Sequence, residues 1–385
     1  MSDAILTINA GSSSIKFAIY EHGAEPRELG RGQVEKLGTA ARLEVHAEGA
    51  SAEREEIGAA DHDKALKAIL DHLGPILSGR RVAGVGHRIV HGGPDFAAPE
   101  RLTPDVMNRL AGFEELAPLH QPYNLAAVRA AQIAFPGALQ LGCFDTGFHH
   151  GHPWVNDTFA LPRRHYAQGV RRYGFHGLSY DFIAGELARL FPDLAQGRVI
   201  VGHLGNGASM CALKGGRSLS STMGFSALDG LPMGTRSGQI DPGVLLYLMQ
   251  SEGMNAEALT QLLYRESGLK GLSGISHDMR TLLASDATEA AEAVDYYVAR
   301  IRHAIGGLTA DLGGLDALVF TGGIGENSDV IRARVCAGLG WLGASLDDAA
   351  NRAGAAEVGN GAVRVLVIPT DEERVIARAV AAALT

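Results

Sequence analysis

A polar turn near the start of the chain is the feature that most constrains its fold. Residues 9–16 are Asn-Ala-Gly-Ser-Ser-Ser-Ile-Lys, and the apolar segments 5–8 and 15–20 predict a strand on each side of a tight turn. The glycine lets backbone N–H groups approach an anion, the serine hydroxyls can donate to it, and Lys16 adds positive charge. A Walker A loop instead joins a strand to a helix through G-x-x-x-x-G-K-[ST], a pattern that the sequence does not contain. A nucleotide would therefore require a different architecture.

Length and composition limit the functional classes. With 385 residues the chain is long enough for two or three domains, each with its own core. The formal net charge of −9 argues against nonspecific binding to nucleic acid or to an anionic membrane. Cys143, Cys211 and Cys336 lie far apart in apolar segments and are expected to be buried thiols. No segment resembles a signal peptide or reaches the length of a membrane span, so a cytoplasmic location is the default expectation.

The hydrophobic pattern predicts an α/β protein whose strands end in polar residues. Segments 82–90 and 139–144 are predicted as buried strands, and Asp145 directly follows the second, where open α/β sheets carry their sites. Thr370 is predicted to cap a final helix, because Glu373 follows it at capping-box spacing. Further strands are predicted at 198–202, 210–213, 318–320 and 363–368, and further helices at 123–133, 244–250 and 287–312.

A weak internal repeat relates two parts of the chain. Residues 5–13 resemble residues 200–209, because both read as a strand followed by a turn of Asn, Gly and Ser. A third glycine-rich turn is predicted at 321–327, again after an apolar strand. One such turn is explained equally well by a plain hairpin, but three together favour phosphate binding. The repeat is either a chance match or the trace of a duplicated domain with one phosphate turn in each half.

Four charged or polar residues near glycine-rich segments are candidates for a site. Arg88 and Arg236 have a guanidinium group, which pairs with carboxylate or phosphate, although either residue also fits a surface position. Asp145 and His176 are candidates for a reacting centre, although most of the fifteen histidines are expected to be structural or solvated.

Two further residues are candidates for a metal site. No His-Glu-x-x-His or Cys/His spacing supports zinc. Asn9 and Glu372 carry hard oxygen atoms of the type that Mg²⁺ accepts, usually together with waters. Their separation along the chain gives no reason, by itself, to place them together.

Ten motifs, in order through most of the chain, resemble those of the acetokinase family, the acetate kinases. They are residues 9–16, 86–93, 118–122, 144–149, 172–177, 203–207, 233–238, 276–280, 323–327 and 369–373. The resemblance implies the fold of sugar kinases, the Hsp70 ATPase domain and actin, with two duplicated actin-like, ribonuclease H-like α/β domains around a nucleotide cleft. It implies an N-terminal domain at 1–147, completed by a C-terminal helix at 371–385, and a nucleotide-binding domain at 148–370. It also implies ATP and ADP as co-substrates, Mg²⁺ (with Mn²⁺ as an alternative), acetate and acetyl phosphate, and a homodimer.

The resemblance assigns roles to individual residues. Asn9 and Glu372 would hold the metal, and Lys16, Ser12 and Ser14 would line the phosphates. The catalytic residues would be Asp145, His176, Arg236 and Arg88, and the acyl group would contact Arg88, Val90, Leu119 and Phe175. The nucleotide would contact His203, Leu204, Gly205, Asn206, Gly207, Asp278, Met279, Arg280, Gly323, Ile324, Gly325, Glu326 and Asn327.

The chemistry of a carboxylate kinase is consistent with these residue types. A carboxylic acid has a pKa of about 4–5, so the substrate is already ionised at neutral pH and needs no strong base. The difficulty lies in bringing two anions together and in stabilising a loose, in-line transition state, which arginine, a metal ion and histidine can do. We therefore expect Asp145 to orient the substrate or a metal-bound water rather than to act as a general base.

One departure from the family pattern leaves the substrate open. Ala227 replaces a proline that contributes to the acyl pocket in many family members, and Asp371 replaces a common asparagine with little expected effect. One methylene is worth only about 1–3 kcal/mol of discrimination, so propionate is a candidate substrate. The alternatives are therefore a propionate or butyrate kinase of the same family, and a non-catalytic nucleotide-driven clamp like Hsp70 or actin. Such a clamp would not need Arg88 and Arg236.

Overall fold

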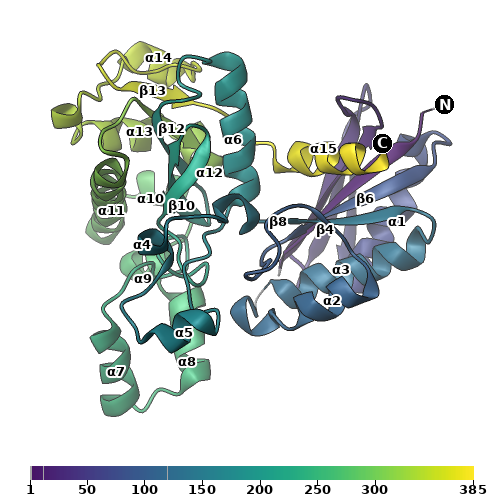
Figure 1. The fold of residues 1–385 in the computed structure, drawn as a ribbon, viewed down its shortest axis with the longest axis horizontal. Helices are drawn as coiled ribbons and strands as arrows, with labels where there is room; N and C mark the ends of the chain where they lie inside the picture. The colour runs from purple at the N-terminus through teal and green to yellow at the C-terminus, as the bar shows by residue number, and fades with distance from the viewer. Residues whose placement is uncertain (1, 12, 119) are drawn as a thin grey trace. The chain divides into compact units, whose positions relative to one another are not determined.

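The chain forms two compact units in the computed structural model, which describes residues 2–11, 13–118 and 120–385 (Figure 1). Unit 1 comprises Met1–Phe148 and Asp371–Thr385, and unit 2 comprises His149–Thr370. Two predicted site residues, Ser12 and Leu119, lie outside the described residues. Within the described ranges, no helix has the length and apolar character needed to cross a bilayer.

Unit 1 contains an eight-stranded mixed sheet in the order β5-β4-β3-β2-β1-β6-β8-β7. β1 pairs antiparallel with β2 and parallel with β6, which in turn pairs parallel with β8. The strands are β1 (Ala4–Ala10), β2 (Ser14–Glu21), β3 (Arg27–Glu35), β4 (Ala41–Ala47), β5 (Glu53–Gly58), β6 (Val82–Ile89), β7 (Glu100–Arg101) and β8 (Leu139–Phe144). The helices are α1 (His62–Leu77), α2 (Pro104–Ala111), η1 (Glu114–Leu116), α3 (Gln121–Ala134), α15 (Glu372–Leu384) and, at the end of the first segment, η2 (Gly147–His149).

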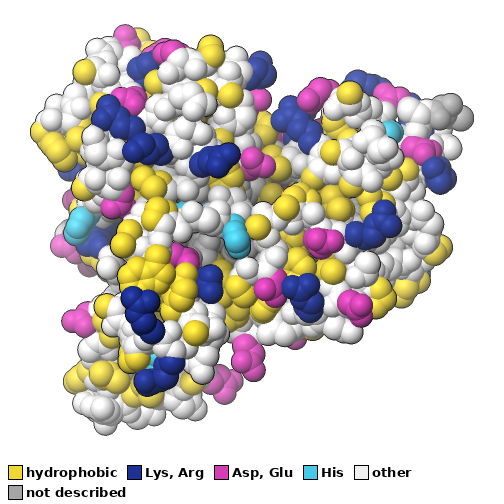
Figure 2. Space-filling model, viewed as in Figure 1, with side chains coloured by type: hydrophobic (Ala, Val, Ile, Leu, Met, Phe, Trp, Pro, Cys, Tyr) yellow, Lys and Arg dark blue, Asp and Glu magenta, His cyan; other side chains and the backbone are white. Residues whose placement is uncertain are grey.

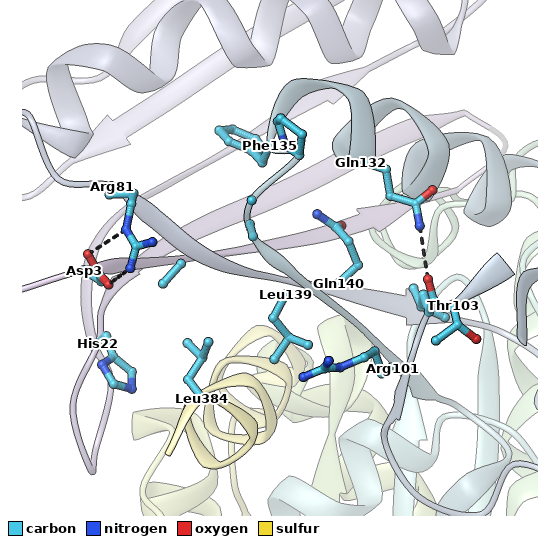
Figure 3. Close-up of a pocket in the computed structure, with 15 residues that line it drawn as sticks. Asp3, His22, Arg81, Arg101, Thr103, Gln132, Phe135, Leu139, Gln140 and Leu384 are labelled. Carbon is cyan, nitrogen blue, oxygen red and sulfur yellow. Dashed lines mark hydrogen bonds and ion pairs between the residues drawn. The ribbon is translucent and has the colours of Figure 1, made fainter.

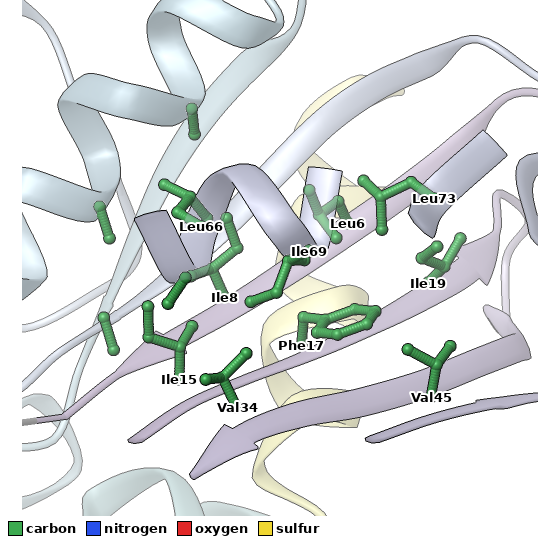
Figure 4. Close-up of a cluster of buried hydrophobic side chains, with 14 of the residues drawn as sticks. Leu6, Ile8, Ile15, Phe17, Ile19, Val34, Val45, Leu66, Ile69 and Leu73 are labelled. Atoms are coloured by element: carbon green, nitrogen blue, oxygen red, sulfur yellow. The ribbon is translucent and has the colours of Figure 1, made fainter. Parts of the chain in front are cut away.

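The alternation of side chains along the strands of unit 1 covers both faces of the sheet. Leu6 and Phe17 belong to a buried cluster with Ile69 of α1 on one face (Figure 4), and burial of each such side chain contributes about 1.5–3 kcal/mol. On the other face, glycines 84 and 86 of β6 let α15 approach closely, because a Cβ at Gly86 would lie 2.2 Å from Ile376 Cγ2. Helix α15, from the end of the chain, is thereby packed against the central strands.

Unit 2 contains a five-stranded sheet in the order β11-β10-β9-β12-β13. β10 pairs antiparallel with β9 and β11, whereas β12 pairs parallel with β9 and β13. The strands are β9 (Arg198–Leu204), β10 (Ala208–Lys214), β11 (Arg217–Ser221), β12 (Ala317–Thr321) and β13 (Arg364–Val367). The helices are α4 (Trp154–Asp157), α5 (Arg163–Ala167), α6 (Gly177–Leu190), α7 (Pro242–Ser251), α8 (Ala256–Gln261), the π-helical η3 (Leu262–Glu266), α9 (Gly268–Ser273), α10 (Met279–Leu283), α11 (Thr288–Leu312), α12 (Gly322–Asn327), α13 (Asp329–Cys336), η4 (Gly340–Leu342) and α14 (Asp348–Ala353).

The two sheets repeat one topology. β3-β2-β1-β6-β8 and β11-β10-β9-β12-β13 each consist of three antiparallel strands followed by two that run parallel to the central strand. The hairpin turns also correspond, because Gly11 N donates to Ser14 O at 2.8 Å and Gly205 N donates to Gly207 O at 3.1 Å. The prediction of two duplicated α/β halves is therefore confirmed, and the weak sequence repeat marks equivalent hairpins.

Two local predictions are wrong. Residues 322–327 form helix α12 rather than a turn, because Gly322, at φ +76°, packs against the Leu204 backbone and directs the chain straight into a helix. The N-cap of α15 is Asp371 rather than Thr370, because the Asp371 carboxylate accepts a hydrogen bond from Arg374 N at 3.0 Å. Thr370 N instead donates to the Glu326 carboxylate at 3.1 Å.

Candidate active site

Arg88, near the end of β6, is the centre of a charged cluster in unit 1. Its Nε and Nη2 donate to the Asp145 carboxylate at 2.9 and 2.5 Å, and its Nη1 donates to Asn9 Oδ1 at 3.1 Å. Glu372 Oε2 lies 3.7 Å from Arg88 Nε. These four residues, the arginine cluster, come from β1, β6, the residue after β8 and the first turn of α15. Residues that are far apart in sequence thus meet at one edge of the sheet.

The strand register explains why these side chains meet. β1, β6 and β8 are parallel, so their carboxyl ends lie at the same edge of the sheet. Asp145 N donates to Ile89 O at 3.0 Å, which extends the pairing of β8 with β6 by one residue. Helix α15 begins at Glu372, so this carboxylate lies at the same edge.

The electrostatic balance of the cluster is negative. Burial opposes the charge on Arg88, but the carboxylates of Asp145 and Glu372 outweigh this effect and raise its pKa. Burial also raises the pKa of Glu372, with a further contribution from Asp145, while Arg88 and Lys16 act in the opposite direction. Burial and the neighbouring Glu372 likewise raise the pKa of Glu373. Asp371 is paired with Arg374 at 3.1 Å, which leaves the carboxylates of Asp145, Glu372 and Glu373 with the cations Arg88 and Lys16.

The donor set of the cluster is chemically suited to a divalent metal ion. Asn9 supplies an amide oxygen and Glu372 a carboxylate, the hard ligands that Mg²⁺ prefers, and the excess negative charge would be offset by a cation. Among residues 2–11, 13–118 and 120–385, no three His, Cys, Asp or Glu side chains are grouped to hold a metal by themselves. A metal here would therefore complete its shell with water or phosphate oxygens.

Asn124 supports the turn and the cluster and was not singled out from the sequence. Its side chain donates to Ala10 O at 2.6 Å and accepts from Val90 N at 2.9 Å, so it joins the end of β1 to the end of β6. Val90, a predicted acyl-pocket residue, is buried, while Lys16 and Ser14 border the turn on β2. The available signal was a polar side chain at a position on the buried face of a predicted helix.

In unit 2, two stacked histidines lie beside the second hairpin. The rings of His176 and His203 are 4.3 Å apart and nearly parallel. Ser209 Oγ lies 2.8 Å from His176 Nδ1 and 2.5 Å from the Tyr180 hydroxyl. His176 is held at φ +58° directly before α6, and its Nε2 lies 3.3 Å from the position that a Cβ on Gly207 would occupy. The serine therefore fixes the ring so that Nε2 faces the glycine turn.

Arg236 lies in a glycine-rich loop of unit 2. Its Nη1 donates to Ala227 O at 2.9 Å and lies 3.9 Å from the Cβ position of Gly207. The structure thus brings Arg236 and His176 to the same glycine, as a shared site requires. Phe175, another predicted acyl-pocket residue, is buried, and its carbonyl lies 2.9 Å from His149 Nε2.

The predicted nucleotide segments of unit 2 lie next to one another around glycines. Gly234 contacts Asn206 of the hairpin turn, and a Cβ on Gly234 would be 3.4 Å from the Cβ of His277, which precedes Asp278. Gly205 lies next to Gly323, because a Cβ on Gly205 would be 3.7 Å from Gly323 N. Glu326 does not point its Oε1 outward, because this atom accepts from Gly322 N at 2.8 Å and from Thr370 N at 3.1 Å.

Asp278 and Arg280 are paired with each other at the start of α10. Their shortest contact is 2.6 Å, and this hydrogen bond lowers the pKa of Asp278 to about 2. The Arg280 side chain is 90% exposed, so solvent reaches it readily. The assignment of these residues and of Met279, like the other role assignments, stays a prediction.

Three comparisons with known proteins agree. The model of the acetokinase family matches residues 4–378. The chain is 52% identical to the acetate kinase of Methylocella silvestris, over 98% of this chain and 97% of that protein. It is also similar to crystal structures of an acetate kinase from Porphyromonas gingivalis (37% identity, TM-score 0.87, 98% of both chains) and a propionate kinase from Francisella tularensis (33% identity, TM-score 0.91, 98% and 99% of the chains). The chain therefore belongs to the acetokinase family.

Proposed function

We propose that the chain catalyses the reversible, Mg²⁺-dependent transfer of a phosphoryl group from ATP to acetate, with acetyl phosphate and ADP as products. The observation that carries this proposal is the arginine cluster. A guanidinium held by Asp145 and Asn9 at the end of parallel strands is a fixed cation for an anionic substrate. A nucleotide-driven clamp would not require a second such cation at the glycine turn, where Arg236 lies.

Each half would act on a different part of the reaction. Arg88 would bind the acetate carboxylate, and Lys16 with the turn after β1 would attract the transferred phosphoryl group. His176 and Arg236 would donate hydrogen bonds to the phosphoryl oxygens as charge spreads over them in the transition state. A metal ion at Asn9 and Glu372 would neutralise charge on the phosphates.

Asp145 would orient Arg88 rather than remove a proton. It is buried, and both of its oxygen atoms accept hydrogen bonds from the guanidinium. Acetate is already ionised at neutral pH, so the reaction offers no proton for this carboxylate to abstract. Its negative charge would instead hold the Arg88 guanidinium in one orientation while the substrate binds and the product leaves.

The quaternary structure that we propose is a homodimer through α7. None of the ten residues of α7 is buried, although Val244, Leu246, Tyr247 and Met249 are 41–56% exposed apolar side chains. Figure 2 shows apolar side chains on the surface of the part of unit 2 that carries α7 in Figure 1. An apolar helix of this length is marginal in water unless a partner covers it. Leu246→Glu should convert a dimer into a monomer by light scattering, and an unchanged mass would refute the assignment.

Propionate is a second candidate substrate. The crystal structure of a propionate kinase is similar over nearly the whole chain, and Ala227 provides less bulk than proline beside Arg236. The two candidates differ only in the acyl group, so one assay decides between them.

The test is the hydroxamate assay for acyl phosphate. Purified protein with ATP and Mg²⁺ is incubated with acetate, propionate or butyrate, and kcat/KM is compared among them. The proposal predicts acyl hydroxamate with acetate that depends on the metal and on Arg88. ATP hydrolysis without any acyl phosphate would indicate the clamp instead.

A further inference from the structure

A pocket lies in unit 1, at the opposite ends of the strands that carry the arginine cluster. Its volume is about 620 Å³, and it is lined by residues next to the starts of β1, β6 and β8 and by Leu384 at the end of α15 (Figure 3). The six residue steps from Val82 to Arg88 along β6 correspond to about 20 Å. The pocket is therefore separate from the proposed reaction site.

The pocket carries more positive than negative charge. Arg81 pairs with Asp3, with Nη2 2.5 Å from Oδ2. Arg101, from the short edge strand β7, lies on another side of the pocket, and its guanidinium has no hydrogen-bond or ion-pair partner in the described part of the chain. Two arginines thus face one carboxylate in a chain with a net charge of −9. Local positive charge of this kind attracts anions.

The wall of the pocket also contains polar atoms that lack a partner. Gln140 is only 7% exposed, and its Oε1 lies 2.8 Å from His87 Nε2. Within the described ranges, Gln140 Nε2 and His22 Nε2 have no hydrogen-bond partner although both are buried. An unsatisfied buried donor costs about 1–3 kcal/mol, and both atoms are closed to solvent, so a ligand would reach them only after the side chains of this wall rearrange. Figure 3 shows Gln140 between Phe135 and Thr103.

Part of the remaining wall is apolar. Phe135, Leu139 and Leu384 line the pocket, and in Figure 3 the two leucines lie between Arg81 and Arg101. The volume lies in the range of sites for small organic molecules, and the apolar patch offers a surface that a carbon skeleton can contact.

We infer that this pocket binds a small organic anion, with its carboxylate or phosphate group between Arg81 and Arg101 and its carbon skeleton against Phe135, Leu139 and Leu384. The bound anion contacts β6, β8 and α15, the same elements that hold Arg88, Asp145 and Glu372 at their other ends. Because the pocket lies at the opposite ends of these strands, its ligand would occupy a place distinct from the substrates of the proposed kinase.

Calorimetric titration of the full chain tests the site. The protein is first saturated with ADP and acetate, so that anion positions at the reaction site are filled, and is then titrated with succinate or glycerol 3-phosphate, with glycerol as the uncharged control. We expect one binding site per chain for at least one anion, and the preferred probe distinguishes a carboxylate ligand from a phosphate ligand. Saturation by neither anion would overturn the inference.

Two matched variants show where the anion binds. Arg101→Ala should weaken binding about tenfold, the effect of losing one charged hydrogen bond. Arg129→Ala, which removes an exposed arginine of α3 outside the pocket, should leave the affinity unchanged. Circular dichroism confirms that both variants are folded. Equal affinities of wild type and Arg101→Ala would place the anion elsewhere and overturn the inference.

Discussion

Unit 1 and unit 2 use one strand topology for two different surfaces. In unit 1, β6, the parallel neighbour of the first hairpin strand β1, carries Arg88, and β8 beside it is followed by Asp145. The equivalent strands of unit 2, β12 and β13, are followed by the glycine helix α12 and by Thr370. Unit 1 therefore presents charged side chains from its strands at this edge. In unit 2 the strand ends present backbone groups, histidines and hydroxyls, and the charged Arg236 comes from a loop.

The two units share their strand topology and their hairpin turn but not the side chains at the ends of the strands. Both hairpin turns are closed by a backbone hydrogen bond from a glycine, so the shared strand topology includes a turn of small residues in each unit. The chemistry depends on the residues at and just beyond the carboxyl end of each parallel strand, which differ between the two units. Such a division suits a reaction in which one half must bind a small charged acceptor and the other a large nucleotide.

Replacement of Arg88 in unit 1 or of Arg236 in unit 2 tests most directly whether the two units have different roles. Arg88→Leu leaves Asp145 and Glu372 without their main cation, so we expect kcat/KM for acetate to fall by more than about 10³-fold. Arg236→Leu removes a donor from the glycine turn and should lower kcat by about 10²–10³-fold. Only the first variant should also lose thermal stability, since it leaves buried carboxylates unpaired. Wild-type turnover in either variant would contradict the role assigned to that arginine.

Replacement of Glu372 tests the negative balance of unit 1. Glu372→Gln should lower kcat/KM by about 10²–10³-fold and abolish the increase in Tm that Mg²⁺ gives the wild type. The raised pKa of Glu372 means that the native state binds this proton more tightly than the unfolded state. The contribution of Glu372 to the free energy of unfolding therefore falls as the pH rises. At neutral pH the ionised carboxylate of Glu372 destabilises the folded state.

The stability of Glu372→Gln should accordingly depend on pH in a defined direction. Its Tm should exceed that of metal-free wild type by about 2–4 °C at pH 7.5, the shift that about 1 kcal/mol produces. The difference should shrink as the pH falls toward about 4.3, where the unfolded carboxyl is also protonated. Glu373→Gln, beside it on α15, is the control that should retain activity. If the Tm of Glu372→Gln at pH 7.5 is lower than that of the metal-free wild type, ionised Glu372 does not destabilise the folded state and the prediction is wrong.

Asp145→Asn separates orientation from proton transfer in unit 1. The amide keeps the size of the side chain but loses its charge and one acceptor for Arg88, so we expect kcat to fall about 10²-fold. The pH profile of kcat should keep its shape, because the proposed role of Asp145 is to orient Arg88 and not to transfer a proton. Near-full turnover would show that the charge is not essential, and a lost acidic limb would support a general base.

Ser209→Ala makes a finer test in unit 2. It removes the hydroxyl beside His176 Nδ1, so the ring is less well oriented and kcat should fall about tenfold with little change in KM. Ser179→Ala is the matched control, because Ser179 Oγ lies 2.8 Å from Nδ1 of the stacked His203. That variant should raise KM for ATP more than it lowers kcat. Identical kinetic changes in the two variants would show that the two histidines do not have separate roles.

Much of this architecture could be predicted from the sequence, and the failures have physical causes. Strands β1, β6, β8 and β9 were predictable because long apolar segments end in glycine or polar residues. Strands β3–β5 were missed, since β5 is half composed of glutamate and most of its side chains are exposed. Thr370 matched a capping pattern, but a carboxylate one residue later competed successfully for the same backbone N–H groups.

The site was less predictable than the fold. Residue type alone selected Arg88, Asp145 and Glu372, but only the parallel register and the packing of α15 bring them together. Asn124 was not selected, and Ser209 was selected only as part of a predicted glycine-rich turn, because a residue that holds other groups leaves no motif of its own in a single sequence. Glu326 fitted a predicted ligand segment, yet its Oε1 caps backbone N–H groups instead.

The smallest expected effect concerns the acyl group. The Ala227 carbonyl accepts from Arg236, and proline at this position would keep that acceptor while adding bulk. Ala227→Pro should therefore raise the ratio of acetate to propionate kcat/KM about tenfold, the lower end of what one methylene provides. Ala227→Gly, which removes bulk, should lower the same ratio. Because both substitutions retain the backbone carbonyl, kcat for acetate should change much less than the ratio, and an unchanged ratio in both variants would place the acyl pocket away from Ala227.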